Sequence, residues 1–198
     1  MRSSESGFQL VELLVTAAVA MLAIGIATPP VLEWAAARQV RLAAGEVGSA
    51  LALARAYAVT HAVHVGVKFR VAESGAVSWT LHRDGDGDGV RTNDIDAGVD
   101  PPVAPTRHLL HFGRQVRLGF PPGTPPRDPA DPRRRLDRLD DPIRFNRSDI
   151  ASYSPLGGST PGSVYVTDGR SRLAALRVFA ATGRMRVIAY DARTEQWK

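Results

Sequence analysis

The apolar and polar residues of this 198-residue chain fall into three successive patterns. In the first, from Phe8 to Leu32, the polar side chains are limited to Gln9, Glu12, Thr16 and Thr28. About 20 apolar residues suffice for a helix to cross a bilayer. We therefore expect residues 8–32 to form a membrane-spanning helix.

In the second pattern, over residues 33–61, apolar residues recur at helical spacing among Ala, Leu and Arg, which favour helices. The apolar stripe contains Val40, Val47, Leu51, Ala54 and Ala58, while Arg38, Arg41, Glu46 and Arg55 lie elsewhere. This segment is predicted to continue the first helix as an amphipathic one that packs on a globular head. A single helix from Phe8 to about Thr60 would be roughly 80 Å long.

In the third pattern, over residues 62–198, short alternating segments separated by turn residues predict antiparallel strands. A hairpin is expected from His64–Val71 and Ala76–Leu81, and further strands at Leu109–Phe112, Gln115–Leu118, Ile143–Phe145, Ser163–Thr167, Leu173–Ala180 and Arg184–Tyr190. No helix is expected after residue 62, and the Pro- and Arg-rich residues 120–142 are predicted to form an exposed loop. The expected fold class is α+β, with a long N-terminal helix packed on an antiparallel, β-rich head.

Glu12 is a carboxylate inside an apolar run, where charged groups are costly and usually functional. An ordinary secretory signal, cut after Gly25-Ile26-Ala27, leaves this residue without a role. A cut before the run, between Gly7 and Phe8, keeps it in the mature chain. A third interpretation is that Glu12 lies near the helix end and reaches the membrane interface.

The segment Gly7–Val15, GFQLVELLV, resembles the N-terminus of type IV pilins and pseudopilins, G-F-x-L-[IV]-E-L-L-V. The resemblance implies a leader (residues 1–7) removed by prepilin peptidase, a methylated Phe8, and a helix kink at Pro29. It also implies that Glu12 pairs with the N-terminal amine of a neighbouring subunit and so sets the axial register of a filament. Other pilin or pseudopilin subunits, prepilin peptidase and the bacterial inner membrane are the implied partners, with the head in the periplasm.

The acidic loop, residues 84–100, contains six Asp and one Arg. Asp84, Asp86 and Asp88 followed by Gly89 match the start of an EF-hand-type Ca²⁺ loop. The usual bidentate acid would fall on Ile95, and Asp94 is the candidate substitute. A structural Ca²⁺ ion is expected here; the alternative is a solvated acidic loop without a metal. No other cofactor is expected.

Charge is uneven along the chain: residues 101–198 hold 17 of the 25 Lys and Arg but only 9 of the 20 Asp and Glu. An anionic partner is one explanation, and a solvated basic surface is the other. Within this half, Arg184 and Arg186 are spaced to project from one face of a strand, and Arg170 and Arg172 have the same spacing. Paired guanidinium groups suit phosphate contacts.

The string Gly183-Arg184-Met185-Arg186 before the last predicted strand resembles the C-terminal signature of the GspH/FimT branch of pilin-like proteins. Two functions follow from this resemblance. One is a minor pilin or pseudopilin that primes or caps a type II secretion pseudopilus or a type IV pilus. The other is a minor pilin that binds double-stranded DNA during natural transformation. The alternative is that the string has no binding role. Gly183 is then an ordinary turn glycine, and the arginines beside it are exposed strand residues.

Catalysis is not expected. The chain has no cysteine, and no G-x-S-x-G elbow, glycine-rich nucleotide loop or H-E-x-x-H helix is recognised in it.

Overall fold

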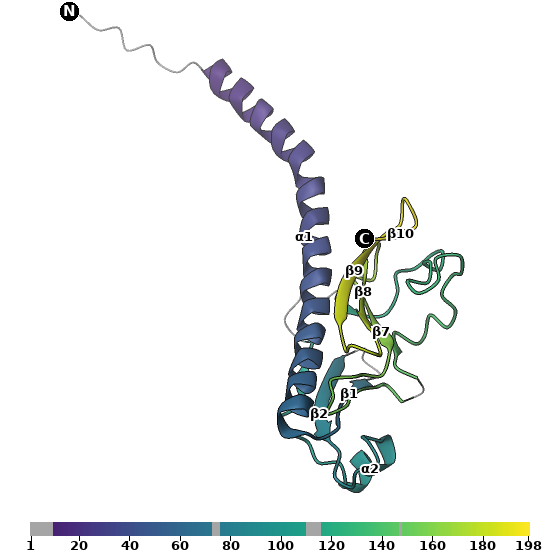
Figure 1. Cartoon of the computed structure of the whole chain (residues 1–198). Coiled ribbons are helices and arrows are strands. Elements are labelled where there is room, and N and C mark those ends of the chain that lie inside the picture. The colour runs from purple at the N-terminus through teal and green to yellow at the C-terminus, as the bar shows by residue number, and fades with distance from the viewer. Residues whose placement is uncertain (1–9, 73–75, 110–115, 147) are drawn as a thin grey trace, which may run out of the picture. The chain divides into compact units, whose positions relative to one another are not determined.

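The computed structural model describes residues 10–72, 76–109, 116–146 and 148–198, without the side chains of residues 26–32 (Figure 1). The chain divides into two compact units, Met1–Ala36 and Ala37–Lys198. The second unit contains all of the strands and is called the head below.

Helix α1 extends from Leu10 to His61, close to the length predicted from the sequence. Its backbone stays helical through Pro29 and Pro30, and the kink at Pro29 remains a prediction. Within the described residues, no helix combines the length and the apolarity needed to span a membrane.

The predicted apolar stripe of α1 is the buried face of its second half. Val40, Val47, Leu51, Ala54 and Ala58 are each at most 2% exposed. They belong to the main hydrophobic core, which also contains Ala43, Ala44 and Ala50 of α1 together with residues of both sheets. Most of these helix residues are small, which lets the helix backbone lie close to the strands. At Gly48 the nearest atoms to an added Cβ are side-chain atoms of Leu176, 3.6 Å away.

The first sheet has the strand order β3-β2-β1-β6. Its strands are β1 (Val65–Val71), β2 (Val77–Arg83), β3 (Arg107–His108) and β6 (Ile150–Tyr153). The predicted hairpin is confirmed, since β1 and β2 pair antiparallel with Phe69 opposite Trp79. The alternating inward residues Val65, Val67 and Phe69 are buried against the core.

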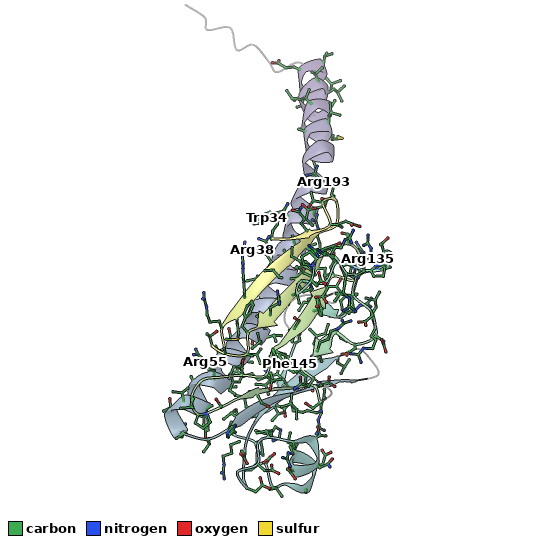
Figure 2. The ribbon with its side chains drawn as sticks, turned by 45° about the vertical axis from the view of Figure 1, so that its right-hand side comes forward. Trp34, Arg38, Arg55, Arg135, Phe145 and Arg193 are labelled. Atoms are coloured by element: carbon green, nitrogen blue, oxygen red, sulfur yellow. The ribbon has the colours of Figure 1, made fainter. Side chains whose placement is uncertain are left out.

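The second sheet has the order β10-β9-β8-β7-β4, and β5 pairs with β7. The strands are β4 (Arg117–Leu118), β5 (Ile143–Arg144), β7 (Gly162–Thr167), β8 (Leu173–Val178), β9 (Met185–Asp191) and β10 (Gln196–Trp197). All pairings are antiparallel. Phe145, just after β5, is fully buried between the helix and the sheets (Figure 2).

Four elements differ from the sequence prediction. The prediction of no helix after residue 62 is wrong, because α2 (Thr92–Ala97) forms inside the acidic loop. It ends at Gly98, whose left-handed φ of 77° lets backbone N–H groups of the following residues reach the carbonyl oxygen of Asp94. Strands β6 and β10 were not expected. Of the strand predicted at Leu109–Phe112, residues 110–112 lie outside the described part, and β3 lies just before it.

Residues 120–142 are not simply an exposed loop, which corrects the sequence prediction. The loop lies on the side of the second sheet away from α1 (Figure 1). Phe120 and Leu136 are buried in a second cluster with Tyr165, Leu173, Ala175 and Ile188. The physical reason is that this face of the sheet is apolar and requires cover. The segment is called the covering loop below.

Candidate functional site

The first part of α1 exposes an apolar surface around Glu12. Leu10, Val11, Leu13, Leu14, Val15, Val19, Met21, Leu22 and Ile24 are between 56% and 77% exposed. Glu12 lies in the first turn and is exposed too. A helix that is apolar on all sides is usually covered by protein or lipid. Gly7 and Phe8, the predicted cleavage and methylation residues, lie outside the described part of the chain.

The acidic loop brings three of its four predicted ligands together. Asp84, Asp86 and Asp88 each offer a carboxylate oxygen, and these oxygens lie within 4.8 Å of one another. Asp94 is not part of this group among the described residues; its carbonyl oxygen accepts the N–H groups of Val99 and Asp100 instead. Three hard oxygen donors suit Ca²⁺, but they fall short of the six to eight that it takes in proteins. Binding of Ca²⁺ remains a prediction.

The loop is also organised by its own backbone. The Asp84 carboxylate accepts the N–H groups of Asp86, Gly87 and Gly89, at 2.7–3.2 Å. Buried Asp100 accepts the N–H groups of Gly85 and Arg91, both at 3.0 Å. Burial raises the pKa of the Asp84 carboxyl, but the backbone hydrogen bonds outweigh it, so the pKa lies below its usual value. Asp84 and Asp100 therefore act as anchors of the loop fold.

The pKa of the Asp88 carboxyl is affected by the neighbouring carboxylates. Partial desolvation raises the pKa of this carboxyl, the charges of Asp86 and Asp94 raise it further, and only Arg91 opposes them. Arg91 forms an ion pair with Asp88. Part of the negative charge of this loop is thus balanced within the chain.

The glycine of the G-R-x-R string has a structural role. Gly183 has a φ of +58°, and a Cβ there would lie 2.5 Å from the carbonyl oxygen of Gly157 and 2.8 Å from Nε of Arg55. Arg55 projects from α1 (Figure 2) and donates from Nε to the Gly157 carbonyl at 3.2 Å. Only glycine fits this place without strain. Because Gly183 lacks a Cβ, the β8–β9 hairpin can lie close to the Gly157 carbonyl and the Arg55 side chain.

The two arginines of the string have different surroundings. Both are exposed, but Arg184 precedes β9, whereas Arg186 lies on β9 directly opposite Arg177 of β8. Arg177 donates from Nη1 to the Pro129 carbonyl at 2.6 Å, and its guanidinium lies 5.1 Å from the ring centre of Phe179. Within the described part of the chain, the Arg186 guanidinium has no hydrogen bond or ion pair.

Arg170 and Arg172 do not extend this pair. They lie in the turn before β8, whereas Arg184 and Arg186 follow β8 in the next hairpin. The six residues of β8 separate the two groups by about 20 Å at 3.3 Å per residue. In the turn, Oδ1 of buried Asp168 accepts the N–H groups of residues 170, 171 and 172 at 2.9–3.0 Å.

A cavity of about 380 Å³ lies between the covering loop, strands β8 and β9, and β10. It is lined by Arg127, Pro129, Pro132, Arg177, Phe179, Arg186, Ile188, Glu195, Gln196 and Trp197. The single carboxylate among them, Glu195, binds Arg127 at 2.9 Å and Arg135 at 2.6 Å. The indole N–H of Trp197 donates to the Arg127 carbonyl at 2.7 Å.

Sequence reasoning singled out Arg186 but did not predict this cavity. Arg177 lies nine residues earlier, and only the strand register places it opposite Arg186. Glu195 and Trp197 come from a short terminal strand, and Arg127 from a loop predicted to be exposed. The sequence signal that pointed towards this site was the excess of Lys and Arg in residues 101–198.

Comparison with known proteins found a structural likeness but no match in sequence. No family model matches the chain, and no curated protein sequence matches it. The minor pseudopilin EpsH from the type 2 secretion system of Vibrio cholerae is similar in structure, with a TM-score of 0.45 and 12% sequence identity. The match covers 76% of this chain and 97% of that chain.

Proposed function

We propose that this chain is a pilin-like filament subunit, a minor pilin or pseudopilin that primes or caps a type II secretion pseudopilus or a type IV pilus. The observation that carries the proposal is Glu12 within the G-F-x-L-V-E-L-L-V segment, at the start of an uncovered apolar helix. In a filament, the packed helices of neighbouring subunits cover such a helix. The cationic amine of a neighbour is an available partner for the carboxylate.

In this proposal the chain is made as a precursor and cut between Gly7 and Phe8 by prepilin peptidase, with methylation of Phe8. Residues 8–32 anchor it in the bacterial inner membrane before assembly, with the head in the periplasm. This anchoring rests on the amino-acid sequence alone. The second half of α1 supports the proposal by joining the anchor to the head, since its apolar stripe is buried in the head's core.

The test is expression of the full chain with and without a prepilin peptidase, followed by N-terminal sequencing. A new N-terminus at Phe8 that is lost in Gly7→Val is expected. Glu12→Ala should still reach the membrane but should not enter filaments, and Glu12→Gln separates the role of the charge from that of side-chain size. Normal incorporation of Glu12→Ala would contradict the register role.

The second candidate function is binding of double-stranded DNA by a minor pilin. The observation that favours it is the exposed Arg184 next to Arg186 in the basic half of the chain. Binding that neutralises phosphates weakens steeply with salt and is insensitive to sequence. A titration of the full chain with a DNA duplex over a salt series tests it. Because phosphate contacts are made from exposed surfaces, Arg184→Ala and Arg186→Ala should then weaken binding similarly.

A further inference from the structure

The cavity beside β8 and β9 has more positive charge than the chain itself neutralises. Arg177 and Arg186 are directly opposite on neighbouring strands, an arrangement that destabilises a sheet when both residues carry the same charge. Arg177 donates to a neutral carbonyl and lies over the Phe179 ring, and neither contact supplies a negative charge. A bound anion would remove the repulsion between the two guanidinium groups.

Glu195, the carboxylate that lines the cavity, does not neutralise Arg177 and Arg186. Both oxygens of Glu195 are occupied, with Oε2 bound by Nε and Nη2 of Arg127 and Oε1 bound by Arg135. Hydrogen bonds from Arg135 and Arg127 lower the pKa of Glu195, so this residue stays charged and stays paired with them. The pair Arg177 and Arg186 therefore faces the cavity without an acidic partner among the described residues.

Half of the lining residues are apolar. Phe179, Ile188 and Trp197 present hydrophobic surface, and Pro129 and Pro132 form the opposite wall. The indole of Trp197 is fixed by its hydrogen bond to the covering loop. A volume of about 380 Å³ is at the small end of ligand pockets. Such a site suits a group that carries one anion next to an apolar body.

We propose that this cavity binds an extended peptide segment of a partner protein in which one carboxylate side chain is flanked by apolar side chains. The carboxylate lies between Arg177 and Arg186, where guanidinium groups form charge-assisted pairs. The apolar neighbours lie against Ile188 and Trp197. Binding of this peptide does not depend on filament assembly, so it can succeed or fail independently of the proposed function.

A polyanion fits this cavity less well. The covering loop beside it carries Asp128 and Asp131, whose carboxylates accept backbone N–H groups of the same loop. They alternate with the arginines of this loop, so the surface beside the cavity carries charges of both signs. A nucleic-acid backbone presents a row of phosphates and requires a continuous basic surface. A single carboxylate needs only the pair Arg177 and Arg186.

The experiment follows the indole resonances of the full-length protein in detergent micelles by ¹⁵N–¹H NMR. The chain has three tryptophans, and Trp197→Phe assigns the one in the cavity. The probe is a capped peptide with one glutamate between two leucines. We expect it to shift the Trp197 signal in a saturable way and to leave the signal of buried Trp79 unchanged.

Two variants and two further probes decide the outcome. Arg186→Gln should weaken peptide binding about tenfold or more, while the matched Arg184→Gln keeps it. The same peptide with glutamine in place of glutamate should bind as poorly as the glutamate peptide binds to Arg186→Gln. Equal binding of both peptides, equal effects of the two arginine variants, or no shift at all would overturn the proposal. A stronger response to a short DNA duplex than to the peptide would overturn it in favour of nucleic acid.

Discussion

Arg177 and Arg186 lie directly opposite each other on β8 and β9, and both line the cavity beside the covering loop. Two like charges in register are unusual in a sheet because each destabilises the other. The arrangement distinguishes Arg186 from Arg184, although both belong to the same short string in the sequence. This distinction separates the peptide-binding proposal from the DNA-binding one.

Leu51→Ala should strongly destabilise the head. Leu51 is fully buried in the main core, and removing a buried leucine side chain costs about 2–5 kcal/mol of unfolding free energy. Leu53, two residues along the same helix, is 48% exposed, so Leu53→Ala should change stability by at most about 0.5 kcal/mol. Urea denaturation of the two full-length variants checks this. Similar midpoints would mean that the predicted face of α1 is not the packed one.

Gly183→Ala and Gly45→Ala should have opposite effects. An alanine at position 183 requires a left-handed backbone and a Cβ that collides with the Gly157 carbonyl, a cost of about 1–3 kcal/mol. Gly45 lies within α1, where an added Cβ meets nothing within 4 Å. Alanine there should stabilise by about 0.5–1 kcal/mol through helix propensity. Thermal unfolding measures both, and a stabilised Gly183→Ala would contradict the close contact of hairpin and helix.

The turn before β8 should make stability depend on pH through Asp168. Burial raises the pKa of this carboxyl, but hydrogen bonds from the N–H groups of Arg172, Arg170 and Ser171 outweigh it, and the pKa lies below its usual value. A lowered pKa in the folded state stabilises the protein above the ordinary carboxyl pKa, near 3.9, and this contribution disappears as pH falls towards the folded value.

Asp168→Asn removes this titration while keeping a carbonyl oxygen that can accept hydrogen bonds. The difference in melting temperature between the native chain and Asp168→Asn should be largest at about pH 6 and shrink towards pH 3. Asp168→Ala should cost about 1–3 kcal/mol at neutral pH, because three backbone N–H groups lose their acceptor. A difference that grows on acidification would contradict the assignment.

Glu195→Gln should loosen the covering loop with little effect on global stability. The ion pairs with Arg127 and Arg135 are partly exposed to water, so each contributes little to the free energy of unfolding. They nevertheless tie the covering loop to the turn before β10. Limited trypsin digestion should cut the variant faster after Arg133 or Arg134, with the melting temperature nearly unchanged. Identical cleavage rates would show that the apolar cluster alone holds the loop.

Much of the fold could be predicted from periodicity. The buried face of α1 is confirmed because residues at helical spacing pack on the strands, and the β1–β2 hairpin follows from alternation near a turn. Strand β6 was missed because its four residues pair with β1, about 85 residues earlier in the chain, and such partners are not encoded locally. Helix α2 was missed since its cap geometry stabilises a segment with weak helix propensity.

The candidate site was less predictable. The grouping of Asp84, Asp86 and Asp88 follows from alternation in a glycine-rich loop, whereas the role of Asp100 as a buried anchor depends on how the loop closes. The cavity could not be found from the sequence, because it depends on the register of β8 and β9 and on the covering loop. Phe120 and Leu136, two apolar residues far apart in a Pro-rich stretch, were weak signals of that cover.

The alanine-rich face of α1 also determines how the helix would bear mechanical load. Small side chains such as Ala43, Ala54 and Ala58 give a smooth contact that offers little resistance to sliding along the helix axis. Leu51 interlocks with the core, and Arg55 is hydrogen-bonded to the Gly157 loop, so these two residues oppose axial shear. Tension applied along the helix would therefore be borne by the larger side chains of this face, and failure of their contacts would separate the helix from the sheets while the chain stays continuous.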